Sequence, residues 1–139
     1  MEQHKALNLL SLARKGGRIE AGEEPVGAAA RAGHARLIVV ASDATEHTLR
    51  RVQSFVHGTK QPYLRVEFDK DALGHALGRS AVAVAALTDV ALAQAFVRAL
   101  DQPEQHSALL AELDERVARV KKRQAEEKAH RNNVRRGKK

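Results

Sequence analysis

Residues 19–45, IEAGEEPVGAAARAGHARLIVVASDAT, decide the fold of this chain. They predict a strand end, a glycine–acid turn, a helix of small residues over Glu23–Ala32 that stops at Gly33, a buried strand and a helix start. The short apolar run Leu37–Ala41 is typical of a strand buried on both faces. A helix that opens from a tight glycine turn offers free N–H groups and a positive dipole end to phosphate or a base edge.

The alternation of helix and strand continues on both sides of this stretch. Helical spacing of apolar residues predicts further helices over Glu2–Lys15, Asp43–Val56, Leu73–Leu77 and Thr88–Leu100. Further strands are predicted at Arg18–Ala21, Leu64–Phe68 and Val82–Leu87. Asp43, with Glu46 in a capping box, and Thr88 are expected to cap the helices that they open. This pattern predicts an α/β protein, a three-layer α/β/α sandwich with a central four-stranded mixed sheet.

The excess positive charge lies at the end of the chain. The whole chain has a net charge of +7, whereas residues 116–139 hold 11 basic and 2 acidic side chains, +9, which leaves −2 for residues 1–115. We divide the chain into an α/β/α domain, residues 1–102, and a basic C-terminal helix and tail, residues 103–139. The high pI of about 10.1 favours an anionic partner, and nucleic acid is favoured over a membrane.

The C-terminal segment begins as a narrow amphipathic helix. Its apolar stripe is formed by Leu109, Leu113, Val117 and Val120. Glu112–Arg116 and Glu115–Arg119 stand at the favourable i,i+4 spacing for ion pairs. Beyond Val120 the segment is expected to stay helical at first and to be disordered in its last part.

No motif of an enzyme, a cofactor site or a metal centre is present. The seven histidines are scattered, there is no cysteine, and neither a P-loop nor a GxGxxG pattern occurs. Ser80 lacks the second glycine of a nucleophile elbow. Glu23 and Glu24 diverge by about 100° on a helix and make a poor catalytic pair. We therefore expect no catalysis, no cofactor and no metal. The lack of cysteine and of a signal or spanning segment fits a cytoplasmic protein.

Two stretches carry a resemblance to a known family: LLSLARKGGRIEAGEEPVGAAARAGHARLIVVASDAT (residues 9–45) and LGHALGRSAVAVAALTD (residues 73–89). Together they resemble the L7Ae family of ribosomal proteins, small α/β/α proteins that recognise kink-turn RNA, and in particular its bacterial YlxQ-type branch. The resemblance covers residues 4–100 and leaves out the basic tail.

The resemblance implies RNA contacts from three loops. These map onto Gly22, Glu23, Glu24 and Pro25; onto Ser42 and Asp43; and onto Gly78, Arg79, Ser80 and Ala81. Glu24, Pro25 and Ala28 stand where strong kink-turn binders of the family carry Asn, Glu and Lys. For each loop a plainer interpretation is open: turn formation for the glycines, favourable helix-dipole charges for the glutamates, and capping for Asp43.

Basic residues outside these loops complete the candidate RNA-binding set. Lys15 and Arg18 flank Gly16-Gly17 and are expected near the same edge as the loops. In the tail the candidates are Lys121, Lys122, Arg123, Arg131, Arg135 and Arg136. The tail is either an electrostatic RNA contact or only a solubilising extension.

These observations lead to a functional hypothesis with two alternatives. We expect a monomeric, non-catalytic RNA-binding protein associated with the ribosome or its assembly, whose body recognises structured RNA and whose tail adds electrostatic affinity. One alternative is a protein-interaction module that docks a partner through the C-terminal helix. The other is an RNA-delivery subunit of an RNA-modifying enzyme.

Overall fold

The computed structural model describes the backbone of residues 4–137 and, within it, the side chains of residues 4–102 and 105–132. Its elements follow the order α1 (Lys5–Lys15), β1 (Ile19–Ala21), α2 (Glu23–Arg31), β2 (Leu37–Val40), α3 (Glu46–Val56), β3 (Tyr63–Arg65), α4 (Lys70–Ala76), β4 (Val84–Leu87), α5 (Val90–Ala99) and α6 (Pro103–Gly137). The predicted alternation is confirmed, although β2 and β4 are shorter than the predicted strands, β3 covers 63–65 rather than the predicted 64–68, and α4 begins three residues earlier than predicted.

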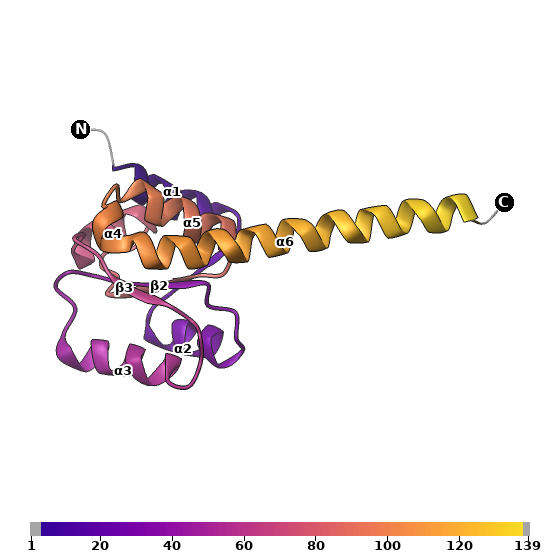
Figure 1. The fold of residues 1–139 in the computed structure, drawn as a ribbon. Helices are drawn as coiled ribbons and strands as arrows, with labels where there is room; N and C mark the ends of the chain where they lie inside the picture. The colour runs from indigo at the N-terminus through magenta and orange to yellow at the C-terminus, as the bar shows by residue number, and fades with distance from the viewer. Residues whose placement is uncertain (1–3, 138–139) are drawn as a thin grey trace.

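The four strands form one mixed sheet in the order β1-β4-β2-β3. Strand β4 pairs antiparallel with both β1 and β2, whereas β2 and β3 run parallel. Helices α2 and α3 cover one face, and α1, α4, α5 and the start of α6 cover the other (Figure 1). The predicted three-layer α/β/α sandwich is therefore confirmed.

The core is centred on the two middle strands. Every residue of β2 and β4 is buried, which confirms that both apolar runs are strands covered on both faces. Phe96 of α5, fully buried, is the largest side chain in this core. Gly33 has a φ of +74°, a backbone conformation that favours glycine, and it follows the end of α2 as predicted.

Two helix caps differ from the sequence prediction. Helix α3 begins after Thr45, whose side chain accepts a hydrogen bond from the Thr48 N–H, so Asp43 is not its cap. Ser42 and Asp43 instead form a turn, in which the Ala44 N–H donates to the Ala41 carbonyl. The helix therefore begins two residues later than predicted. Glu46 is then the first helical residue and is not placed for a capping box.

Helix α5 is capped by Asp89 and not by Thr88. The Asp89 Oδ2 accepts a hydrogen bond of 3.0 Å from the Leu92 N–H. Thr88 instead extends the pairing of β4 with β1, because its N–H donates to the Arg18 carbonyl. The strand pairing thus continues one residue longer than the sequence indicates. The helix cap is therefore Asp89, the next residue.

We predict that Asp89→Ala lowers the free energy of unfolding by about 1 kcal/mol, because it removes an N-cap acceptor. Thr88→Ala is the matched control, since it leaves the Asp89 cap intact, and it should cost clearly less. Urea unfolding of both variants provides the measurement. Equal losses would contradict the assignment of the cap to Asp89.

Helix α6 packs on the body through its first half. Leu113 is fully buried and Val117 is buried against the core, as the predicted stripe requires, whereas Val120 is exposed. The Asp114 carboxylate accepts hydrogen bonds from Gln94 (2.6 Å) and Arg98 (3.0 Å) of α5. Of the predicted stripe, Leu113 and Val117 thus face the core, Leu109 is partly buried against it, and Val120 is exposed.

The second half of α6 projects away from the body (Figure 1). Both predicted i,i+4 ion pairs form, Glu112–Arg116 closely and Glu115–Arg119 at 3.9 Å. The backbone stays helical to Gly137, so the prediction of a disordered last part is wrong up to that residue. Lys138 and Lys139 lie outside the described residues. The domain boundary at residue 102 stays a prediction.

Candidate nucleic-acid interface

The three loops implied by the resemblance meet where β1 and β2 end and β4 begins. We call this end of the sheet the three-loop edge (residues 22–25, 42–43 and 78–81). Val84, at the start of β4, stands opposite Val40 at the end of β2. The N–H of Gly22 donates to the Val84 carbonyl at 2.9 Å, so the end of β1 reaches the same point. The antiparallel pairing of β4 with both strands therefore brings segments distant in sequence to one edge.

The first loop opens α2 as the sequence predicts. Gly22 has a φ of +102°, a conformation that favours glycine, and it immediately precedes the helix. Glu23 is already engaged: its Oε1 accepts from the Thr48 hydroxyl at 2.8 Å and its Oε2 pairs with Arg51 at 3.3 Å. Glu24 is exposed. Of the two glutamates, Glu24 is thus the one whose carboxylate is available to a ligand.

The second loop is held by contacts on both sides. Ser42 donates its N–H to the Phe68 carbonyl, and its own carbonyl accepts from Arg65 at 2.8 Å. The Asp43 Oδ1 accepts a 2.9 Å hydrogen bond from the N–H of Lys70, the first residue of α4. Asp43 therefore satisfies a helix N-terminus, as predicted for its residue type, but that of α4 and not of α3.

Two arginines gather at the third loop. Arg79 Nη1 donates to the Ala21 carbonyl at 3.4 Å and so links this loop to the end of β1. Arg14, which the sequence analysis did not single out, lies against Gly78: a Cβ built on Gly78 would be 2.5 Å from its guanidinium. Nothing in the spacing of α1 distinguishes Arg14 from other exposed cations. Ser80 and Ala81 are exposed beside them.

Arg18 is not at the three-loop edge, and the prediction is wrong for this residue, whereas for Lys15, exposed at the end of α1, it stays a prediction. Arg18 precedes β1 and pairs with Thr88 after the end of β4, which places it at the opposite edge of the sheet. Its guanidinium forms an ion pair of 3.3 Å with Asp89. The error arises because β1 itself separates the Gly16-Gly17 turn from the Gly22 turn.

The tail candidates lie on the projecting half of α6. Lys121, Lys122, Arg123 and Arg131 are exposed. The side chains of Arg135 and Arg136 lie outside the described residues. A projecting helix that carries cations around its surface is suited to electrostatic contact with an anionic partner.

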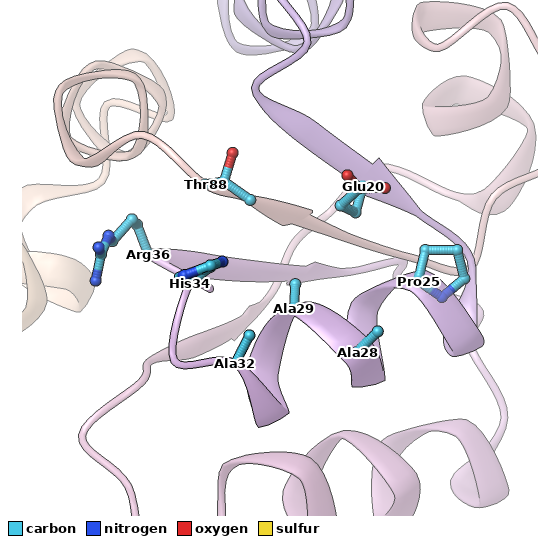
Figure 2. A pocket seen from close by; sticks show the side chains of 8 residues that line it. All are labelled: Glu20, Pro25, Ala28, Ala29, Ala32, His34, Arg36 and Thr88. Atoms are coloured by element: carbon cyan, nitrogen blue, oxygen red, sulfur yellow. The ribbon is translucent and has the colours of Figure 1, made fainter.

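A groove runs beside the edge strand β1, between it and α2 (Figure 2). Its volume is about 630 Å³, and it is lined by Glu20, Pro25, Ala28, Ala29, Ala32, His34, Arg36 and Thr88. Pro25 lies at one end and Arg36 at the other. Apart from Pro25, the residues that α2 contributes to this lining are alanines. Ala28 is exposed, while Val26 is fully buried.

Among the described residues, no group of three or more His, Cys, Asp or Glu side chains is placed to hold a metal ion. Within the same residues, every buried side-chain nitrogen or oxygen has a hydrogen-bond partner. No helix in residues 4–137 is both long and apolar enough to cross a membrane.

The sequence matches, over residues 4–98, the family described as ribosomal protein L7Ae/L30e/S12e/Gadd45. The chain belongs to this family. It is 32% identical over 93 residues to the RNA-binding protein YlxQ of Bacillus subtilis (strain 168), and the alignment covers 67% of this chain and 92% of that protein. The resemblance to the L7Ae family and its YlxQ-type branch is thus confirmed.

Two solved structures share this fold. A protein with unknown function from Bacillus halodurans superposes with a TM-score of 0.66 and 27% identity, covering 71% of this chain and 99% of that one. A 15.5 kD RNA binding protein from Giardia lamblia gives a TM-score of 0.56 and 24% identity, covering 71% and 84% of the two chains. The second likeness shows the shared fold.

Proposed function

We propose that this L7Ae-family protein binds structured RNA without catalysis, as a component or assembly factor of the ribosome. The observation that carries the proposal is the convergence of three exposed loops at one edge of the family fold, with a net +9 segment at the end of the chain. The YlxQ relative, named an RNA-binding protein, supports it. We further propose that the protein is monomeric and cytoplasmic.

The three-loop edge has groups suited to a folded RNA strand. Arg79 and Arg14 supply cations for phosphate: the Arg79 guanidinium bonds the carbonyl at the end of β1, and the Arg14 guanidinium lies against Gly78. The exposed Glu24 carboxylate repels phosphate but accepts hydrogen bonds from a base amine. Binding at this edge therefore combines contacts of the two arginines with the RNA backbone and a contact of Glu24, at the start of α2, with the edge of a base. Kink-turn RNA is the proposed ligand class.

The first alternative, docking of a partner protein through α6, has less support. Leu113 and Val117, the apolar residues that would hold a partner helix, are already buried against the body. Of the predicted stripe only Val120 is exposed, and one valine is a small anchor for a protein interface. No observation specifically favours the RNA-delivery alternative.

The test of kink-turn recognition is Ala28→Lys. Ala28 is exposed one turn into α2, so the substitution should leave the fold intact. We expect it to raise affinity for a kink-turn RNA and to steepen the salt dependence of log K by about 0.7–0.9, the effect of one new phosphate contact. Fluorescence titration against a kink-turn RNA and a straight duplex of equal length provides the measurement.

Ser54→Lys, on the exposed surface of α3, is the matched control because it adds the same charge away from the three-loop edge. It should raise affinity for both RNAs slightly and equally. If Ala28→Lys behaves like this control, with equal gains on both RNAs, kink-turn recognition by this edge is rejected. General RNA binding would still stand in that case.

A further inference from the structure

A second concavity lies where α6 leaves the body. It has a volume of about 220 Å³ and is lined by Arg36, Val90, Arg116, Arg119, Val120 and Arg123. We call it the arginine cleft. Four of its six lining residues are arginines, and none is acidic. No loop of the three-loop edge contributes to it.

The arginine cleft is assembled from two distant parts of the chain. Arg116, Arg119 and Arg123 share one face of α6, because residues three and four apart are neighbours on a helix. Arg36 comes from the residue before β2, where its N–H donates to the Leu87 carbonyl at the end of β4. The cleft therefore stands at the opposite edge of the sheet from the three-loop edge.

The cations of the cleft are only partly neutralised by the protein. Arg116 is held by Glu112 and by the Lys60 carbonyl, and it has the structural role of fastening α6 to the body. Arg119 is 3.9 Å from Glu115, and Arg36 reaches only the Gly33 carbonyl, at 3.4 Å. Arg123 has no hydrogen bond or ion pair with another described residue. Such a group of like charges attracts an anion.

The groove along α2 connects this cleft with the three-loop edge. Arg36 lines both concavities, and Figure 2 shows it at the end of the groove away from Pro25. Figure 2 shows Glu20 on the Pro25 side of the groove, so a phosphate is disfavoured there and favoured at the arginine end. An RNA strand that leaves the three-loop edge along α2 would therefore reach the cleft.

We propose that the arginine cleft binds backbone phosphates of the bound RNA and so forms a second contact, shared by the body and α6. Arginine suits this role because its planar guanidinium binds phosphate oxygens in a bidentate manner. The inference rests on the proposed function, since it requires that the protein bind RNA. It assigns part of the affinity to the place where the tail begins, in addition to the electrostatic contribution of the tail itself.

The experiment compares full-length variants against a kink-turn RNA with an extended helical arm. Arg119→Gln/Arg123→Gln removes two cleft cations, and Lys121→Gln/Lys128→Gln removes two from the opposite side of α6. Arg36→Gln removes the body's contribution, and Arg50→Gln, an exposed arginine of α3, is its control. All six substituted residues are exposed, so folding should be preserved, and thermal melting of each variant checks this.

We expect Arg36→Gln to weaken binding about tenfold and to lower the salt slope by about 1, as loss of a phosphate contact does. The helical cleft pair should lose more affinity than the Lys121/Lys128 pair. If Arg36→Gln matches Arg50→Gln, or if the two helical pairs lose equally, the cleft is rejected while RNA binding stands. If the parent protein binds no RNA, both the proposed function and the cleft are overturned.

Discussion

Ending the chain at Val120 is expected to weaken binding to any RNA by about 10⁴-fold at about 0.1 M salt. This assumes that the tail makes about six phosphate contacts, each of which adds ~0.7 to the slope of log K against log salt. The truncation removes nine basic and two acidic residues, all beyond the buried apolar contacts of α6 with the body, and Arg123 of the arginine cleft is one of them. Leu113 and Val117 remain, so the body should stay folded with an unchanged melting temperature. Titration over a range of salt concentrations measures the slope.

The position of the cut matters because α6 has two roles. A chain ended at Glu115 would also lose Val117, which is buried in the core, and Arg116, which bonds the Lys60 carbonyl. Loss of binding would then be confused with loss of folding. Cutting after Val120 separates the two effects. A salt slope that does not change after this truncation would show that the tail is only a solubilising extension.

The second large effect is expected at Gly74, where Gly74→Ala should lower the free energy of unfolding by about 2 kcal/mol through overpacking. A Cβ on Gly74 would lie 2.8 Å from Ala81 Cα and 2.9 Å from the Arg79 carbonyl oxygen. Both are backbone atoms, so relief requires movement of the 78–81 loop and cannot come from a side-chain rotation. Because Arg79 belongs to the three-loop edge, affinity for structured RNA should also fall.

Gly16→Ala is the matched control for this substitution. Its Cβ would meet no atom closer than 3.6 Å, and Gly16 has an ordinary φ of −87°. The change should therefore be neutral or stabilise the protein by about 0.4–1 kcal/mol, by restricting the unfolded chain. Urea unfolding of both variants decides the matter. Equal stability of the two variants would mean that α4 and the 78–81 loop are not as closely packed as the structure has them.

The sequence by itself was enough for the architecture. Each feature that predicted it reflects a local rule. The apolar runs at 37–41 and 82–87 indicate burial on both faces, the spacing of apolar residues between them indicates helices, and Gly33 ends a helix because glycine adopts the required backbone angle easily. Such rules act over a few residues, and the structure confirms them. The resemblance that gave the family rests on the same order of turns and strands.

Only the tertiary structure decided which residues share a surface. Asp43 is a capping type of residue, yet it serves α4 and not the helix that follows it, because the Ala41–Ala44 turn aims it there. Arg18 lies at the opposite end of the sheet from the three-loop edge because β1 separates the two. Arg14, which belongs to α1, lies against Gly78. These contacts depend on strand pairing and helix packing between distant segments, which no local spacing encodes. The meeting of Arg36 with the arginines of α6 is of the same kind.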